Sequence, residues 1–313
     1  MLRLKKKYYN FARKYPSIHR SLKLIFKPLV DSRAKPSPST ALPPDFSKQF
    51  LEEIKNFDII EERRKYLSNI SVVILNYNNK GIVDRCIDSI LENNKFYNCK
   101  ILVVDNQSSD GSYEVLGEKY KDKIVLLRNS KNGCSSGRNL GVKSVNTEYV
   151  LFLDSDQWVL HEYWLDPYIE IFKNKDIDSV GWAGGWLGPT GQAYLSVDDM
   201  PNRYTHKKKI YRSDIDYIGS GGMMMSVALF NEIDGFDINY DPTAYEDTDI
   251  SFKIKNNGGK IVYSPYPGLG HLPHQTTKDG SASHTERMRK NGEYFAKKWE
   301  KLNPKLFESL VKI

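Results

Sequence analysis

The chain has 313 residues, 40% of them hydrophobic, and a net charge of +7, so it can bury the core of one large domain or two small ones. Its apolar runs fall short of the roughly 18 residues of a membrane-spanning helix, and no apolar core follows the first lysines, so we expect neither an integral membrane protein nor a signal peptide. Cys86, Cys99 and Cys134 have no metal-type spacing, which indicates reduced thiols and a cytoplasmic location.

Basic residues are concentrated at the N-terminus. Residues 1–35 carry eleven Lys and Arg and a single acid, Asp31, which gives this segment a charge of +10 and the remainder −3. Bulky apolar and aromatic residues are mixed with these charges, as in segments that lie on anionic membranes, where each basic residue contributes about 1 kcal/mol. We predict a basic amphipathic arm that holds the protein peripherally on the inner face of the membrane. A solvated basic tail and a segment that docks on another protein remain open, and no nucleic acid is expected as a partner.

Two further segments precede the main domain. Residues 36–48 contain four prolines among small polar residues, a composition typical of a linker. Over residues 49–69 apolar positions recur at near-helical spacing, which predicts a helical lead-in. Neither segment carries residues that indicate chemistry.

The next part of the chain alternates two kinds of pattern. Short apolar runs typical of buried strands occur at residues 72–75, 101–104, 124–127 and 150–153. Amphipathic stretches separate them, and the apolar positions between 82 and 91 fall on one face of a helix. This order predicts an α/β domain over residues 70–282 with a mainly parallel, doubly wound sheet flanked by helices. Helices without evident chemistry are expected over residues 283–313.

Polar loops follow three of the predicted strands at one edge of the sheet, where open α/β sheets bind their ligands. They begin with Asn76-Tyr77-Asn78, with Asp105 and with Asp154. Tyr77 can stack on a planar base, and Asp105 can accept a hydrogen bond from a base N–H or a ribose hydroxyl. Taken singly, each of these residues is equally compatible with an ordinary core tyrosine, turn or helix cap.

Two further motifs indicate an anionic ligand and a cation. Residues 132–139 form a small, glycine-rich loop that opens a predicted helix and ends in Arg138 and Asn139, which suits a diphosphate. Asp154 and Asp156 are two apart in an extended backbone, so both carboxylates point the same way and can hold a hard divalent cation. A polar turn that caps the following helix is the simpler alternative for this pair.

Together these motifs resemble an inverting family 2 glycosyltransferase of the GT-A (Rossmann-like) fold. The matching segments are 71–78, 103–112, 132–139, 149–156, 235–237, 245–249 and 261–265, followed by His271. Their order and spacing agree with the family over about two hundred residues, 70 to 275. The 181–217 stretch, rich in Trp, Tyr, Lys and Arg, matches no family motif and is where acceptor contacts are expected.

The resemblance implies a metal-dependent, inverting transfer of a sugar from a nucleoside-diphosphate donor, with a UDP-sugar expected, to the hydroxyl of a glycan, lipid-linked or protein acceptor in bacterial surface polysaccharide or glycoconjugate synthesis. It assigns donor binding to Asn76, Tyr77, Asn78, Asp105, Arg138, Asn139 and Asp154. It assigns Mn²⁺ or Mg²⁺ to Asp156 and His271, with Asp154 beside them. His274 competes with His271 for this role, and a structural His271 is the alternative. A sugar nucleotidyltransferase and a non-catalytic nucleotide-sugar-binding module are the rival functions.

The catalytic acids are expected at a loop-to-helix junction. Glu246, Asp247 and Asp249 precede apolar positions of helical spacing, and Thr248 or Asp249 is expected to cap the helix, which leaves Glu246 and Asp247 to face the cleft. By resemblance, Asp247 is the general base and Glu246 positions the acceptor. The alternative is that these acids only charge the first turn of the helix.

Overall fold

The computed structural model describes residues 65–172, 176–196, 212–264, 268–272 and 282–310. The predicted arm, the linker and nearly all of the helical lead-in lie outside these ranges. Among the described residues, no helix is both long and apolar enough to cross a membrane.

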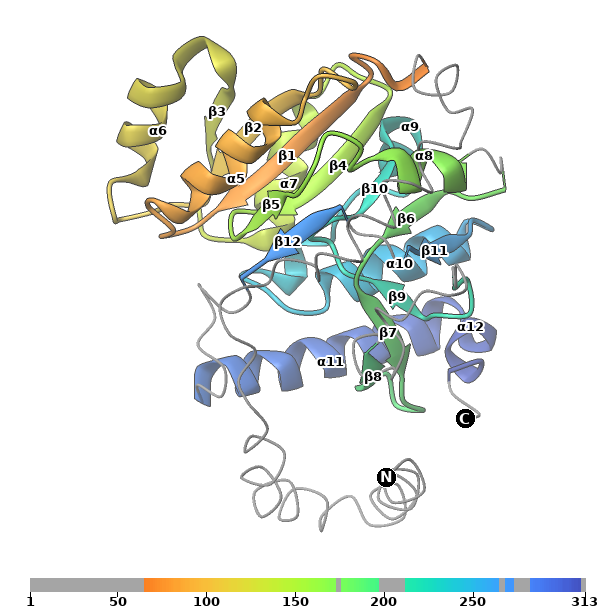
Figure 1. Ribbon diagram of the computed structural model, residues 1–313. Helices are drawn as coiled ribbons and strands as arrows, with labels where there is room; N and C mark the ends of the chain where they lie inside the picture. The colour runs from red at the N-terminus through yellow and green to blue at the C-terminus, as the bar shows by residue number, and fades with distance from the viewer. Residues whose placement is uncertain (1–64, 173–175, 197–211, 265–267, 273–281, 311–313) are drawn as a thin grey trace, which may run out of the picture. The chain divides into compact units, whose positions relative to one another are not determined.

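A seven-stranded sheet forms the centre of the domain, in the order β11-β6-β10-β4-β1-β2-β3 (Figure 1). The four predicted strands are present as parallel neighbours: β1 (Ile70–Asn76), β2 (Lys100–Asp105), β3 (Val125–Arg128) and β4 (Tyr149–Asp154). Strand β10 (Met224–Ser226) runs antiparallel between β4 and β6 (Ser179–Gly181), and β11 (Ile261–Tyr263) pairs in parallel with β6. The predicted fold class, a mainly parallel GT-A-type α/β sheet, is confirmed.

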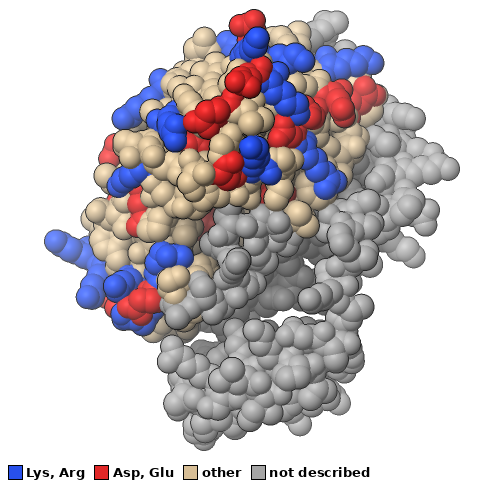
Figure 2. Space-filling model, turned by 90° about the vertical axis from the view of Figure 1, so that its left-hand side faces the viewer, with Lys and Arg blue, Asp and Glu red and all other residues tan. Residues whose placement is uncertain are grey.

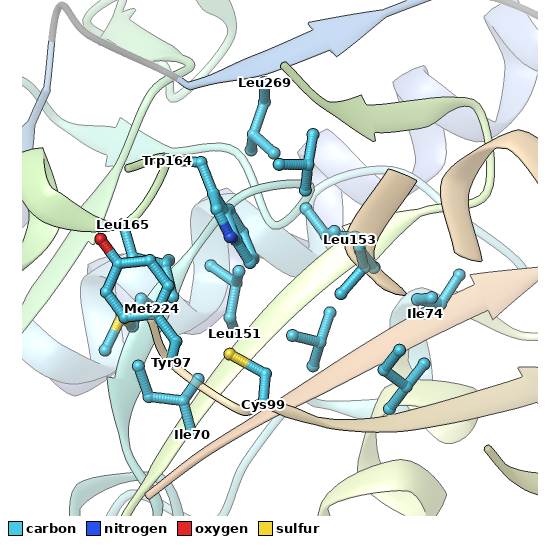
Figure 3. Packing of buried hydrophobic residues seen from close by; sticks show 14 of the residues in the cluster. Ile70, Ile74, Tyr97, Cys99, Leu151, Leu153, Trp164, Leu165, Met224 and Leu269 are labelled. Carbon is cyan, nitrogen blue, oxygen red and sulfur yellow. The ribbon is translucent and has the colours of Figure 1, made fainter. Parts of the chain in front are cut away.

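Helices cover both faces of the sheet because the central strands are apolar on both sides. Alternate residues of β1 such as Val72 and Ile74 pack with α5 (Ile82–Glu92), α6 (Ser112–Tyr120) and α8 (Asp166–Phe172). The intervening residues pack with α7 (Cys134–Lys143), α9 (Val227–Glu232) and α10 (Glu246–Asn256). Figure 3 shows the first of these two cores, where Leu151 and Leu153 meet Trp164.

Two small sheets extend the domain beyond the central one. In the first, β5 (Gln157–Val159) pairs with β12 (Leu269–His271). In the second, β7 (Gly184–Leu187) pairs with both β8 (Ala193–Ser196) and β9 (Tyr217–Ile218). Short 3₁₀ helices follow α6 and α9, η1 (Lys121–Lys123) and η3 (Ile238–Tyr240).

The C-terminal helices build a third core against α10. Helix α11 (Ala282–Leu302) and helix α12 (Pro304–Glu308) bring Phe295, Trp299 and Phe307 onto Phe252 of α10. Apart from Ala282, both helices lie in the predicted C-terminal segment. They therefore rest on the helix that carries the predicted catalytic acids (Figure 1).

One face of the molecule is drawn in Figure 2, where acidic and basic side chains are interspersed. Between helices α5 and α6, for example, Lys119 Nζ of α6 lies 2.6 Å from Asp84 Oδ1 and 3.1 Å from Asp88 Oδ2 of α5. The charged side chains of the described residues on this face are mixed in sign.

Candidate active site

Strand register brings the predicted polar loops to one edge of the sheet. In the parallel ladders Asn76 lies opposite Asp105, and Leu75 lies opposite Asp154. The carboxyl ends of β1, β2 and β4 are therefore level, as the order of strands and helices predicted.

At the ends of β1 and β2, polar side chains bind one another. Asn76 and Asp105 are fully buried: Asn76 Nδ2 donates to Ser112 Oγ at 3.0 Å, and the Ser108 backbone N–H donates to Asp105 Oδ2 at 3.0 Å. Asn78 is exposed and accepts from the Ser109 N–H at 2.8 Å, while Tyr77 is half-buried. Asn76 and Asp105 thus shape the loop after β2, and a direct contact of either with a donor stays a prediction. Of the donor-binding residues predicted at the ends of β1 and β2, Tyr77 and Asn78 are the accessible ones.

The N-terminus of α7, predicted to hold a diphosphate, is occupied by a carboxylate of the protein itself. Asp241 Oδ1 accepts from the backbone N–H groups of Ser135 at 2.9 Å and Ser136 at 3.3 Å, and Asp241 Oδ2 lies 3.3 Å from Lys131 Nζ. The Asp241 carboxylate is thus the acceptor that satisfies these unpaired N–H groups of the helix start. The sequence prediction is corrected on this point, because a carboxylate distant in sequence already fills the position proposed for phosphate.

Arg138 joins the two sides of the site. Its side chain is 3% exposed, Nη2 donates to Asp154 Oδ1 at 2.7 Å, and Nη1 donates to Glu246 Oε1 at 3.2 Å. Helix α7 approaches the sheet closely because Gly137 and Gly141 face it; a Cβ at either position would lie 2.4 to 2.5 Å from a side chain of β1. This close approach is what lets Arg138 reach both carboxylates.

The Asn139 side chain binds the backbone of Phe236. Its Oδ1 accepts from the Phe236 N–H at 2.9 Å, and its Nδ2 donates to the Phe236 carbonyl at 2.8 Å. Both ends of the amide therefore hold the Gly235-Phe236-Asp237 segment against α7. Asn139 thus supports the site through this segment, and its contact with the ribose or diphosphate stays a prediction.

Asp156 and His271 lie side by side, as the resemblance implied. The pairing of β5 with β12 places Gln157 opposite His271, and His271 Nε2 is 3.4 Å from Asp156 Oδ1. That oxygen is buried and accepts no hydrogen bond from the described residues. A buried carboxylate oxygen without a donor, next to an imidazole, fits a divalent cation.

These two side chains make up only part of a coordination shell. Among the described residues, no group of three or more His, Cys, Asp and Glu side chains is arranged to hold a metal ion. Asp154, the third predicted ligand, accepts from Arg138 Nη2 through Oδ1. Its backbone N–H donates to Gln157 Oε1 at 2.9 Å. A cation on Asp156 and His271 would take its other oxygens from a bound ligand, as Mg²⁺ commonly does from phosphates.

The predicted catalytic acids occupy the first turn of α10. The helix begins at Glu246, after Tyr245 in the left-handed region, so the expected cap at Thr248 or Asp249 is wrong. Asp249 is fully buried and binds Lys298, Trp299 and Tyr240 instead. Glu246 is buried against Arg138, whereas Asp247 is half-buried, so of the two acids Asp247 is the accessible one.

Burial changes the protonation of this acid pair. It raises the pKa of Glu246 to about 7, and the neighbouring Asp247 carboxylate adds to this shift while Arg138 opposes it. Burial likewise raises the pKa of Asp247, against the hydrogen bonds from Thr248 and the charge of Arg138. Carboxyl groups with raised pKa values at the mouth of a site are typical of acid–base chemistry.

The glycine loop 219–222 passes between the two carboxylate groups. A Cβ at Gly221 would lie 2.4 Å from Asp154 Oδ2, and a Cβ at Gly219 would lie 3.9 Å from Asp247 Oδ2. The loop is a tight turn, closed by the Met223 N–H donating to the Ser220 carbonyl at 3.1 Å. In the 181–217 stretch, where acceptor contacts are expected, Trp182 and Trp186 are buried, and Tyr204 lies outside the described residues.

Comparison with known proteins identifies the family and the fold of this chain. The family model described as glycosyl transferase family 2 matches residues 71–233. Glycosyltransferase GlyA of Streptococcus pneumoniae serotype 4 is 31% identical over 208 residues, 62% of this chain and 29% of that protein. Poly(ribitol-phosphate) beta-glucosyltransferase of Bacillus spizizenii is 33% identical over 124 residues, 38% of this chain and 20% of that protein. The chain thus spans less than a third of the length of these relatives.

A solved structure shares the fold. GalNAc-T7, crystallised with UDP, GalNAc and Mn²⁺, superposes with a TM-score of 0.57 at 18% identity, covering 80% of this chain and 56% of that one. The family match contains β1, β2, β4 and the loops that follow them, and ends before Glu246 and His271. Because that match covers more than half of the chain, the protein belongs to glycosyl transferase family 2.

Proposed function

We propose that the protein transfers a sugar from a nucleoside-diphosphate donor, with a UDP-sugar expected, to an acceptor hydroxyl with inversion at the anomeric carbon. The observation that carries this proposal is the Asp154–Arg138–Glu246 bridge. This bridge connects the end of β4 to the first turn of α10. Asp154, which is proposed to bind the sugar donor, and the accessible Asp247 therefore flank the same glycine loop, residues 219–222.

Donor binding is assigned to the edge of the sheet. Tyr77 and Asn78 are accessible beside the β2 loop and suit the base, and Asp154, 38% exposed, can accept from the ribose. The shared fold with a protein solved with UDP, GalNAc and Mn²⁺ supports this location for a nucleotide sugar. Arg138 acts by fixing the Asp154 carboxylate rather than by reaching the diphosphate itself.

Asp156 and His271 are the proposed ligands of Mn²⁺ or Mg²⁺. An imidazole ligand favours Mn²⁺ over Mg²⁺. When bound, such a cation neutralises charge on the leaving diphosphate, which stabilises the transition state by several kcal/mol. The protein holds the Asp156 carboxylate and the His271 imidazole 3.4 Å apart, after the end of β4 at Asp154.

Asp247 is the proposed general base. Its carboxylate takes the acceptor's proton as the acceptor oxygen attacks the anomeric carbon, from the side of the sugar opposite the diphosphate. One carboxylate oxygen accepts from the Thr248 N–H at 2.7 Å, which fixes its orientation. Glu246, held by Arg138, forms the wall beside it and positions the acceptor hydroxyl.

The setting we propose is the synthesis of bacterial surface polysaccharide or glycoconjugate at the inner face of the membrane. The name of the Bacillus relative, a poly(ribitol-phosphate) beta-glucosyltransferase, supports a polymer as acceptor. The charge of +10 in residues 1–35 supports attachment to an anionic membrane. Deletion of these residues would then release the protein from anionic vesicles without changing turnover of a water-soluble acceptor.

The proposed function is tested by thermal stabilisation against a panel of nucleoside-diphosphate sugars with Mn²⁺. A ligand at a hundredfold excess over its Kd adds about 2.7 kcal/mol to the free energy of unfolding, which a melting curve resolves. We expect one donor to stand out, and its transfer product to carry the inverted anomeric configuration by NMR. A product with retained configuration would refute the inverting mechanism, and full transfer in EDTA would refute the metal requirement.

A further inference from the structure

Helix α11 contacts the segment that leads into the catalytic helix, although it lies wholly outside the family match. We infer that α11 positions the two acids of α10, with Asn291 and Gly292 as the positioning residues. This inference rests on the proposed function, because it assumes that Glu246 and Asp247 act on the acceptor. Its evidence comes from three sets of contacts along one face of α11.

The first contact is made by Asn291. Its Nδ2 lies within hydrogen-bond distance of three backbone carbonyls in the loop before α10: Tyr240 at 3.0 Å, Thr243 at 3.0 Å and Ala244 at 2.9 Å. One amide group thus gathers the carbonyls of the five-residue loop 240–244, which only Tyr245 separates from Glu246. A side chain that only packed on the surface would not converge on three carbonyls.

The loop that Asn291 holds is strained. Ala244 has φ 89° and Tyr245 has φ 71°, two consecutive residues with a side chain in the left-handed region that normally favours glycine. Such a conformation persists only where the surrounding structure imposes it, and it is concentrated at functional sites. The strained pair immediately precedes Glu246 and sets the direction in which the first turn of α10 leaves the loop.

The second contact is the close approach of Gly292, which has no side chain, to Tyr245. A Cβ there would lie 2.9 Å from the hydroxyl oxygen of Tyr245, closer than carbon and oxygen pack. Tyr245 is buried and its ring centroid is 5.6 Å from that of Phe295, so its ring has a neighbour on the same helix. Gly292 therefore lets α11 lie directly on the residue that precedes the acids.

The third contact anchors the first turn of α10 through Lys298 and Trp299, which lie further toward the C-terminus of α11. Lys298 Nζ lies 2.8 Å from carboxylate oxygens of both Asp237 and Asp249, and Trp299 Nε1 donates to Asp249 Oδ1 at 2.8 Å. Residues 291, 295, 298 and 299 recur at the spacing of one helix face. Asp249 is two residues from Asp247, so this anchor and the Asn291 contact hold the acid pair from both ends.

Two variants test the inference. Asn291→Ala removes the donor to the three carbonyls, and Gly292→Ala displaces Tyr245 while favouring the helix, since alanine has the higher helix propensity. For each we expect a loss of kcat of about tenfold, within the roughly 10²-fold that small misplacements of reacting groups can cost. Donor Kd, measured by titration with UDP and Mn²⁺, should be unchanged, because the donor residues lie on other elements.

Matched substitutions supply the controls. Asn303→Ala removes an asparagine whose Nδ2 donates to Asn256 Oδ1 at 2.9 Å, at the far end of α10. Gly117→Ala adds a methyl group to α6, where a Cβ would lie an ordinary 3.6 Å from Leu126. Both are expected to keep the wild-type kcat, whatever they do to the melting temperature.

The outcomes separate this inference from the proposed function. If Asp247→Asn abolishes turnover while Gly292→Ala keeps the wild-type kcat, the positioning role is refuted and the proposed function survives. If Asp247→Asn itself keeps wild-type kcat, the assignment of the base is refuted first. If Asn291→Ala fails to fold, Gly292→Ala decides. A loss of kcat in Gly292→Ala without a loss of melting temperature supports the positioning role, since a purely structural contact would not separate the two.

Discussion

The guanidinium of Arg138 lies against the carboxylate of Glu246, with Nη1 3.2 Å from Oε1, and both side chains are buried. The other nitrogen of the same guanidinium binds Asp154. One buried cation therefore binds a carboxylate on each side of the site. Removing one member of a buried ion pair leaves an uncompensated charge, which makes this bridge sensitive to substitution.

Arg138→Met should shift the pH dependence of kcat. Arg138 lowers the pKa of both Glu246 and Asp247, so its removal raises both. A general base works only when ionised, and activity is therefore lost as the pH falls through its pKa. In the variant this loss should begin at a higher pH than in the wild type. A pH–rate profile shifted to lower pH would contradict the prediction, and Arg289→Met, on the exposed side of α11, is the control.

Arg138→Met should also lower stability at pH 8, above the pKa of Glu246. Breaking a buried ion pair typically costs about 3–5 kcal/mol, and Arg138 has two buried or half-buried partners. Urea unfolding at pH 8 and at pH 5 measures this. The deficit should be smaller at pH 5, where Glu246, with a pKa near 7, is already protonated. An equal deficit at both values would show that lost packing, rather than charge, is responsible.

Asp247→Asn should lower kcat by roughly 10²–10⁴-fold and leave donor affinity nearly unchanged, since the amide keeps the size of the side chain but cannot take a proton. Glu246→Gln is the comparison, because it preserves the bond to Arg138 through the amide oxygen. Steady-state kinetics with saturating donor measure both. Wild-type kcat in Asp247→Asn together with a large loss in Glu246→Gln would exchange the two roles.

Asp156→Ala and His271→Ala should each abolish the dependence of nucleotide binding on Mn²⁺. The two side chains lie 3.4 Å apart and are the proposed cation ligands, so either loss leaves an incomplete site. Calorimetric titration with UDP in the presence of Mn²⁺ or EDTA measures the effect without reference to turnover. Asp88→Ala, on the surface of α5, is the matched control and should bind as the wild type does. Mn²⁺-dependent binding in both site variants would remove these residues from the metal assignment.

Gly221→Ala should weaken donor binding by about tenfold, or roughly 1.4 kcal/mol, because its methyl group would lie 2.4 Å from Asp154 Oδ2 and displace that carboxylate. The backbone of Gly221 is not in the left-handed region, so alanine brings no conformational penalty of its own. The comparison is Gly117→Ala, where the added methyl group has room. An unchanged donor Kd would show that Asp154 does not contact the donor.

Much of the framework followed from local sequence patterns. Buried strands of a parallel sheet read as continuous apolar runs, so β1, β2, β3 and β4 were predicted to within two residues at each end. The helical period likewise predicted α5. Once the order of strands and helices is known, the polar residues after each strand must meet at one edge. The expectation that Asp154 and Asp156 lie in one extended backbone is wrong, because β4 ends at Asp154 and Ser155 and Asp156 form a turn.

The partner of each charged group was decided only by tertiary structure. Arg138 and Glu246 are 108 residues apart, and Asn139 and Phe236 are 97 apart. Asp241 fills the helix start that the sequence pattern offered to a phosphate, and Asp249 binds α11 where the local pattern predicted a helix cap. Local sequence shows that a helix start needs an acceptor or that a buried acid needs a cation. It does not show which distant residue satisfies that need, because folding brings together side chains whose separation along the chain carries no information about their distance in space.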